Sequence, residues 1–153
     1  MKLEKGNKAL EFSLSDQNGN ETKLIDYKGK KVLIYFYPKA DTPGCTTQTC
    51  SVNDSLKQLE KLNIVAFGIS PDPVDKQKKF SDKFSVKFPL LCDTDNSVAV
   101  AYNVWGEKNM YGKKYMGIIR SSFLIDENGI IKEAWYNVSP GDTVTFAIKA
   151  LEN

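Results

Sequence analysis

Two continuous apolar runs constrain the fold more than any other feature of this sequence. Residues 31–37 (KVLIYFY) and 64–69 (IVAFGI) are rich in β-branched and aromatic side chains and show no regular alternation with polar residues. A strand of this kind must be covered on both faces, which is typical of a sheet packed between helices. We therefore expect both runs to be buried strands near the middle of a covered sheet.

Gly, Pro and Asn divide the rest of the chain into shorter elements. Further strands are predicted at 12–15 and 23–26, about an Asn18-Gly19 turn, at 88–91, and in a hairpin of 115–125 and 130–136. Helices are predicted at 42–62, 75–84, 97–102 and 142–151. The order indicates an α/β fold, with a central mixed β-sheet flanked by helices and an N-terminal β-hairpin. The length suits a single domain over residues 1–153.

The distribution of charge argues against a nucleic-acid partner. The 21 basic and 19 acidic residues are scattered, and the densest basic run, at 76–79, fits the solvated face of a predicted helix. No apolar run approaches the roughly 20 residues that span a bilayer, and the first eight residues lack the apolar core of a secretion signal. We expect a cytoplasmic protein that binds neither nucleic acid nor a membrane.

The chain contains no histidine, which limits the chemistry open to it. Histidine is the commonest general base and metal ligand, so a Ser-His-Asp triad, a Cys-His pair and a His-containing zinc site are excluded. Three cysteines remain: Cys45, Cys50 and Cys92. In a reducing compartment, cysteines more often fill a core, bind metal or catalyse redox reactions than form structural disulfides. Three thiols make a poor zinc set, and we expect neither a metal nor another cofactor.

Cys45 is predicted to lie in the first turn of a helix. Thr42 followed by Pro43 is a helix-start signal, with a hydroxyl at the N-cap and proline at the first helical position. Cys45 is then the third helical residue, where unpaired backbone N–H groups favour an anion such as a thiolate. An ordinary cysteine is mostly protonated at neutral pH. A helix N-terminus stabilises the thiolate by at most about 2 kcal/mol, which is less than a reactive thiolate needs. The further cation that is needed must be Lys or Arg.

Arg120 is the candidate for that cation. It lies in the middle of an apolar strand pattern, residues 117–125. A guanidinium in such a strand is rarely buried without an anionic partner. Two interpretations stay open: Arg120 is an edge-strand charge that points at water, or it faces Cys45 across a pocket and holds the thiolate.

Cys50 follows Cys45 by five residues. On a helix this spacing gives about 7.5 Å of rise, and a Cα separation of roughly 8 to 9 Å. A disulfide needs a separation below about 7 Å, so the first turns of the helix would have to unwind. Gly44 and four threonines, which are indifferent or poor helix formers, would permit this. Alternatively, Cys50 packs against the sheet. Cys92 ends an apolar strand and is interpreted as a buried filler thiol.

These segments resemble a known family. Pro38, Thr42 and Cys45 reproduce the Pro-x-x-x-Thr-x-x-Cys signature of peroxiredoxins, and the residues around them resemble the bacterioferritin comigratory protein (Q-type) subgroup. The likeness extends over essentially the whole chain, including residues 118–125. It implies a thioredoxin-like fold with Cys45 as the peroxidatic cysteine, Thr42 and Arg120 as activating residues, and Pro38 as the proline that shields the pocket.

The resemblance also implies a complete reaction cycle. Hydrogen peroxide or an organic hydroperoxide would oxidise Cys45 to a sulfenic acid, which Cys50 would resolve as an intramolecular disulfide. Thioredoxin or a similar dithiol would then reduce that disulfide. The protein would be a monomeric, atypical 2-Cys peroxiredoxin that serves antioxidant defence and redox homeostasis. Gln48 and Cys92 depart from the usual pattern, because many members carry Glu and a non-thiol residue there.

Two other classes of function remain to be compared with this one. One is a redox-controlled binding module, in which the same disulfide would switch a surface helix. The other is a thioredoxin-type disulfide oxidoreductase, an activity that normally uses a Cys-x-x-Cys pair that this chain lacks.

Overall fold

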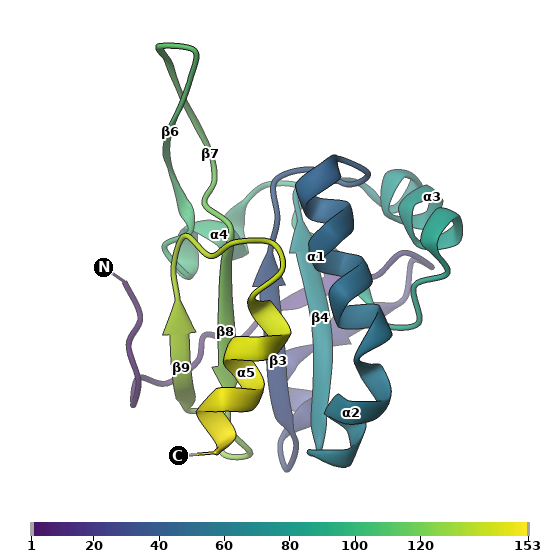
Figure 1. The fold of residues 1–153 in the computed structure, drawn as a ribbon, viewed down its shortest axis with the longest axis vertical. Coiled ribbons are helices and arrows are strands. Elements are labelled where there is room, and N and C mark those ends of the chain that lie inside the picture. Colours follow the sequence, from purple (N-terminus) through teal and green to yellow (C-terminus); the bar gives the residue numbers. More distant parts are fainter. Residues whose placement is uncertain (1, 153) are drawn as a thin grey trace.

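The computed structural model describes residues 2–152, and its centre is a seven-stranded sheet in the order β2-β1-β5-β4-β3-β8-β9 (Figure 1). The strands of this sheet are β1 (Ser13–Ser15), β2 (Glu21–Lys23), β3 (Lys31–Phe36), β4 (Ile64–Ser70), β5 (Leu90–Cys92), β8 (Ser121–Ile125) and β9 (Ile131–Trp135). A separate two-stranded hairpin consists of β6 (Trp105–Met110) and β7 (Lys113–Ile118). The helices are α1 (Pro43–Asp54), α2 (Leu56–Lys61), α3 (Val74–Phe84), α4 (Ser97–Ala101) and α5 (Thr143–Leu151), with a 3-10 turn η1 (Leu24–Tyr27).

The two apolar runs form the neighbouring central strands β3 and β4, as predicted. β3 pairs in parallel with β4 and antiparallel with β8, so the sheet is mixed. Alternate side chains of β3 enter two different cores, with Ile34 and Phe36 on one face and Leu33 and Tyr35 on the other. Burial on both faces explains why the run is apolar without alternation.

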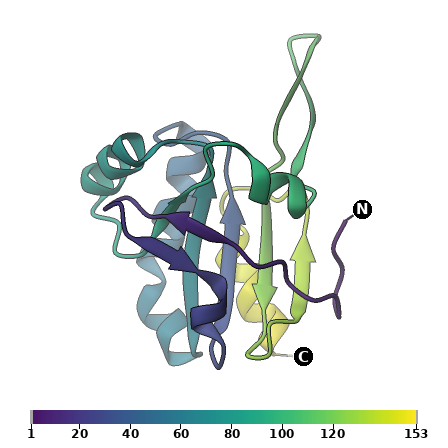
Figure 2. The ribbon, with the colours of Figure 1, turned by 180° about the vertical axis from the view of Figure 1, so that it is seen from behind.

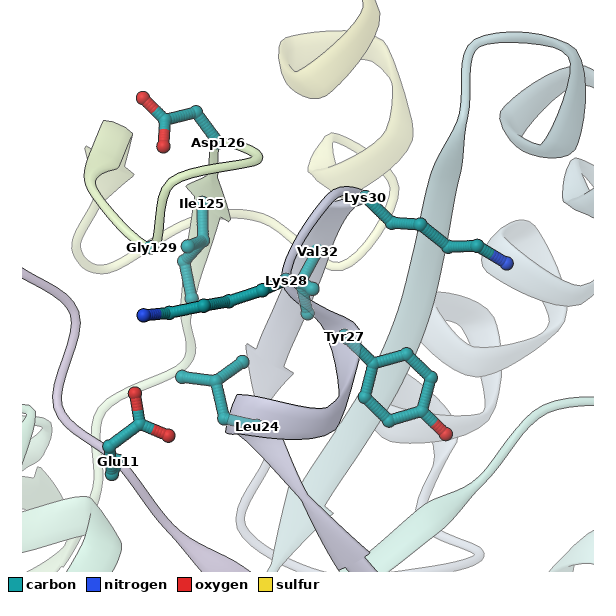
Figure 3. A pocket seen from close by; sticks show the side chains of 9 residues that line it. All are labelled: Glu11, Leu24, Tyr27, Lys28, Lys30, Val32, Ile125, Asp126 and Gly129. Atoms are coloured by element: carbon teal, nitrogen blue, oxygen red, sulfur yellow. The ribbon is translucent and has the colours of Figure 1, made fainter.

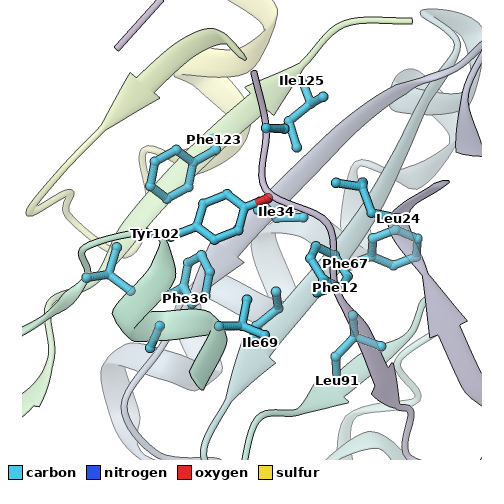
Figure 4. Close-up of a cluster of buried hydrophobic side chains, with 14 of the residues drawn as sticks. Phe12, Leu24, Ile34, Phe36, Phe67, Ile69, Leu91, Tyr102, Phe123 and Ile125 are labelled. Atoms are coloured by element: carbon cyan, nitrogen blue, oxygen red, sulfur yellow. The ribbon is translucent and has the colours of Figure 1, made fainter. Parts of the chain in front are cut away.

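The two cores are covered by different parts of the chain. Figure 4 shows the core that α4 and the N-terminal segment cover. In this core the rings of Tyr102 and Phe123 pack edge to face, with their centroids 5.2 Å apart. α1, α2, α3 and α5 contribute to the other core, which includes Cys45. Figures 1 and 2 show α1, α2 and α5 on one side of the central strands β3 and β4, and the N-terminal hairpin of β1 and β2 on the other side of these two strands. The fold places Cys45 inside a helix-covered layer.

The predicted helix at 42–62 is wrong in one respect, because it is two helices. α1 ends at Asp54 and α2 begins at Leu56. The Ser55 N–H bonds to Val52 O at 3.0 Å, three residues earlier, which tightens the last turn of α1. Asn, Asp and Ser in succession favour such an end, since their short polar side chains compete for backbone hydrogen bonds.

The predicted strand at 115–125 is also two elements, β7 and β8. Between them, Ile119 N–H donates to Val104 O at 2.7 Å, and Val138 N–H donates to Arg120 O at 2.9 Å. These bonds occupy the backbone where a continuous strand would pair with its neighbours. Arg120 therefore lies in a link between two strands rather than in the middle of one.

β7 pairs with β6, a strand that was not predicted. The sequence of β6, WGEKNM, carries almost no apolar alternation, and most of the hairpin is exposed. Figures 1 and 2 show the hairpin projecting away from the main sheet. The predicted strand at 23–26 is likewise corrected, because β2 ends at Lys23 and η1 follows.

Candidate active site

The segment that follows β3 carries the candidate nucleophile. Thr42 is the N-cap of α1, Pro43 its first residue and Cys45 its third, as predicted. The first helical hydrogen bond runs from Thr46 N–H to Thr42 O at 2.8 Å. The N–H groups of Gly44 and Cys45 lie before this first bond and have no partner within the helix. They belong to the turn where the helix dipole favours negative charge.

The predicted side-chain cap at Thr42 is wrong. Its hydroxyl makes no capping bond and donates instead to Lys39 O at 2.8 Å. Asp41, at a φ of 60°, turns the loop sharply just before Thr42. The hydroxyl oxygen keeps its capacity to accept a hydrogen bond. Pro38, half-buried, precedes this turn and lies two residues after the end of β3.

Arg120 contacts Cys45 although the two residues are 75 positions apart in the sequence. The Cys45 side chain is fully buried, and Arg120 Nη2 lies 3.4 Å from its sulfur. Arg120 is the only arginine of the chain. The interpretation in which this side chain faces Cys45 is confirmed, and the interpretation in which it points at water is wrong.

Gly44 allows this approach. A Cβ at residue 44 would lie 3.0 Å from Arg120 Nη2, which is tighter than most real contacts of that atom, and 3.4 Å from Pro140 Cγ. The guanidinium therefore packs directly on the start of α1 because residue 44 has no side chain. Sequence reasoning treated Gly44 only as a weak helix former and missed this steric role.

A chain of buried neutral groups orients the guanidinium. Arg120 Nη1 donates to Gln48 Oε1 at 2.7 Å, and Gln48 Nε2 donates to Thr143 Oγ1 at 2.9 Å. Thr143 in turn shares a hydrogen bond of 3.0 Å with Ser122. Gln48 and Ser122 are fully buried. An amide at residue 48 fixes the guanidinium without neutralising its charge, which leaves the positive charge for the sulfur.

The sequence held a signal for Gln48 but none for its distant partners. Gln48 lies three residues after Cys45, on the same side of the predicted helix. Thr143 belongs to α5, which no local pattern places beside α1. The C-terminal helix is thus part of the site's support.

The second cysteine of α1 is a free thiol. Cys50 is half-buried, and burial together with the nearby Asp54 carboxylate raises its pKa. Cys45 is also free. Both residues lie within the same regular helix, so the spacing argument against a disulfide in this conformation applies.

Cys92 lies at the end of β5, away from α1. It is buried, as predicted for a filler thiol. Burial, with a smaller contribution from Asp16 and Asp72, raises its pKa to about 11.

Other parts of the described chain offer less chemistry. A small pocket at the opposite end of β3 is lined mainly by Leu24, Tyr27, Val32 and charged side chains, with no cysteine among them (Figure 3). Within residues 2–152, no group of three or more Cys, Asp or Glu side chains is placed to hold a metal ion. No helix in that same range is long and apolar enough to cross a membrane.

A cysteine at the start of the helix that follows a central strand, with a guanidinium against its sulfur, defines a thiol-dependent redox enzyme of thioredoxin-like fold. The sequence profile of the AhpC/TSA family matches residues 5–134. "Peroxiredoxin Bcp" of Bacillus subtilis is 43% identical over 153 residues, which cover 100% of this chain and 98% of that protein.

Solved structures give the same result. A crystal structure of a PrxQ mutant from Xylella fastidiosa superposes with a TM-score of 0.92 at 32% identity, over 99% of this chain and 97% of that one. The bacterioferritin comigratory protein of Xanthomonas campestris, studied for its alkyl peroxide reduction activity, has a TM-score of 0.86 at 38% identity, over 92% of this chain and 90% of that one. The chain belongs to the AhpC/TSA family, and within it to the peroxiredoxins of the bacterioferritin comigratory protein (Bcp, or PrxQ) type.

Proposed function

We propose that this peroxiredoxin reduces hydrogen peroxide and organic hydroperoxides with Cys45 as its nucleophile. The observation that carries the proposal is the 3.4 Å contact between Arg120 Nη2 and the Cys45 sulfur, at the start of α1. The thiolate attacks the terminal peroxide oxygen, so that a S–O bond forms and the O–O bond breaks. The leaving oxygen takes a proton and departs as water or alcohol, and Cys45 becomes a sulfenic acid. Arg120 stabilises the charge that develops on the oxygens.

Two residues before the helix would support this step. The Thr42 hydroxyl already donates its hydrogen to Lys39 O, so its oxygen can accept the O–H of a hydroperoxide and orient it. Pro38, half-buried in the loop that follows β3, would limit access of water to the sulfur.

Cys50 would complete the cycle. Its sulfur attacks the sulfenic acid sulfur of Cys45, so that a S–S bond forms, the S–O bond breaks and water leaves. α1 must first unwind between the two cysteines, since the helix holds them too far apart. An external dithiol, thioredoxin or a protein of similar chemistry, would then reduce the disulfide by thiol exchange.

The proposed disulfide lies within one chain, which suits a monomer. Both cysteines belong to α1, so no second subunit is needed to supply a thiol. We accordingly propose a single domain over residues 1–153 that acts as a cytoplasmic monomer in antioxidant defence and redox homeostasis. The Xanthomonas campestris relative, studied for alkyl peroxide reduction, supports organic hydroperoxides as substrates.

Two cysteine variants test the proposal. Cys45→Ser should abolish peroxide consumption, because the thiol that contacts Arg120 is lost. Cys50→Ser should keep the first oxidation, measured by stopped-flow, but lose thioredoxin-driven turnover. Cys92→Ser is the matched control and should keep both. Normal thioredoxin-driven turnover in the Cys50 variant would contradict the resolving role.

A further inference from the structure

Besides the contact of Cys45 with Arg120, three polar attachments tie the side chains of α1 to the rest of the described structure. Thr49 shares a hydrogen bond of 2.8 Å with the Tyr35 hydroxyl of β3. Gln48 bonds to Arg120 and Thr143, as described above. Asn53 donates to a backbone carbonyl at 3.1 Å and accepts from a backbone amide at 2.8 Å in the segment that follows α3. The first two attachments lie between Cys45 and Cys50, and the third lies beyond them.

The surroundings of the Tyr35 hydroxyl are specific. Tyr35 and Thr49 are both fully buried, and the Tyr35 ring stacks on Tyr37 with centroids 5.5 Å apart. A Cβ at residue 68 would lie only 2.7 Å from the Tyr35 hydroxyl, so Gly68 leaves the room that this group occupies. Burial raises the pKa of Tyr35, and the phenol therefore stays neutral. The hydroxyl has Thr49 as its hydrogen-bond partner.

The hydrogen bond between Tyr35 and Thr49 involves the part of α1 that must unwind before Cys50 can attack the oxidised Cys45. Thr49 immediately precedes Cys50, and α1 has to unwind for Cys50 to reach Cys45. Unwinding separates Thr49 from Tyr35 and breaks a buried hydrogen bond, whose loss is costly when a partner is left unsatisfied. The first oxidation has no such requirement, because Cys45 meets Arg120 in the folded helix.

We propose that Tyr35 and Thr49 form a latch, meaning the hydrogen-bonded pair of these two side chains, that sets the rate at which Cys50 resolves the oxidised Cys45. The latch rests on the proposed function, since it requires Cys50 to be the resolving cysteine. Both are positioning residues: they hold α1 closed during attack on peroxide and oppose its unwinding afterwards. While the helix stays closed, the sulfenic acid is open to a second oxidation, to sulfinic acid.

Tyr35→Phe and Thr49→Val each break the latch with little change in shape. The rate of sulfenic acid formation, measured by stopped-flow, should change less than about twofold. Disulfide formation from the sulfenic acid should become roughly fivefold faster, the equivalent of one net hydrogen bond. Sulfinic acid at high peroxide, measured by mass spectrometry, should fall correspondingly. The double variant should be no faster than the faster single variant, because the two residues share one interaction.

Two control variants separate the latch from a general loss of stability. Tyr102→Phe removes a hydrogen bond of 2.6 Å from another fully buried tyrosine, on the opposite face of the sheet. Asn53→Ala removes the attachment of α1 that lies beyond Cys50. Neither should change the resolution rate. The latch is contradicted if both latch variants resolve at the wild-type rate, or if Tyr102→Phe accelerates resolution equally.

The same experiment separates failure of the latch from failure of the proposed function. If the wild-type protein forms the Cys45–Cys50 disulfide but the latch variants leave its rate unchanged, only the latch is wrong. If the wild-type protein forms no such disulfide after peroxide, the resolving role of Cys50 and the latch are both wrong.

Discussion

Cys45 and Cys92 are both buried sulfurs, yet their surroundings have opposite charge. Cys45 lies at the start of α1 with the Arg120 guanidinium 3.4 Å away. Cys92 lies at the end of β5, where burial and nearby carboxylates raise its pKa to about 11. Burial alone makes a thiol inert, because it disfavours the charged form. On the proposed function, the sign of the neighbouring charge distinguishes the buried sulfur that reacts from the one that does not.

One carboxylate links the two sites. Asp72 Oδ2 accepts hydrogen bonds from Ala40 N–H and from the Ser70 hydroxyl, both at 2.7 Å, and so holds the loop that precedes α1. The same carboxylate contributes to the raised pKa of Cys92. The group that shapes the loop before Cys45 thus also helps to keep the other buried thiol protonated.

One large expected difference between the sites is in alkylation of Cys92. Because its pKa is raised from 9.0 to about 11, its thiolate should be roughly 100-fold scarcer than that of an ordinary thiol below about pH 9. Iodoacetamide should therefore label Cys92 far more slowly than a cysteine peptide at about pH 8. Mass spectrometry of each cysteine peptide measures this. Labelling of folded Cys92 at the rate of the free peptide would contradict the comparison.

The same shift predicts how stability depends on pH. The folded protein holds the Cys92 proton more tightly than the unfolded chain does, so stability should fall as pH rises from 9.0 to about 11. Cys92→Ser should remove that part of the fall. Urea unfolding of both proteins across this range is the measurement, and an identical fall in the two would contradict the assignment.

The next effect concerns the cation at Cys45. Arg120→Gln should slow oxidation of Cys45 by hydrogen peroxide by about 10²- to 10³-fold, since charge stabilisation at the reacting oxygens is lost. Arg120→Lys should recover only part of the rate, because an ammonium cannot bond Gln48 and the sulfur in the same planar geometry. The rate of Cys45 oxidation is measured by stopped-flow for each variant. Lys114→Gln, on the exposed hairpin, is the control and should oxidise at the wild-type rate. Equal rates for wild type and Arg120→Gln would sink the role given to this residue.

A smaller effect is expected at Gly44. Gly44→Ala should push the guanidinium away, because the new Cβ would lie 3.0 Å from Arg120 Nη2. The rate of Cys45 oxidation should fall roughly tenfold, about the value of one weakened charge-assisted hydrogen bond. Gly141→Ala is the matched control, since its Cβ would meet no atom within 4 Å. Similar rates for both variants would show that Gly44 is not needed for the contact.

Local signals accounted for the parts of the site that are close in sequence. Thr42-Pro43 correctly predicted where α1 begins and thus the position of Cys45. The apolar runs correctly predicted β3 and β4, whose ends place that helix. The absence of histidine pointed to a basic residue, and Arg120 stood out because it interrupts an apolar pattern.

Long-range contacts were beyond such signals. Nothing in the local sequence pairs Gln48 with Thr143, which are 95 residues apart, or Tyr35 with Thr49. β6 is a polar strand held by pairing with β7 rather than by a buried face, so it left no hydrophobic pattern. α1 ends near Ser55 because short polar side chains compete for backbone hydrogen bonds. In the sequence this signal is weaker than the apolar periodicity, which suggested one long helix.

The most direct test asks which buried sulfur reacts first. Reduced Cys50→Ser protein, which cannot resolve the first product, is treated with one equivalent of hydrogen peroxide in the presence of dimedone, a trap for sulfenic acids. Peptide mapping by mass spectrometry then locates the adduct. We expect it on Cys45 alone, with Cys92 unmodified. An adduct on Cys92, or none on Cys45, would contradict the account.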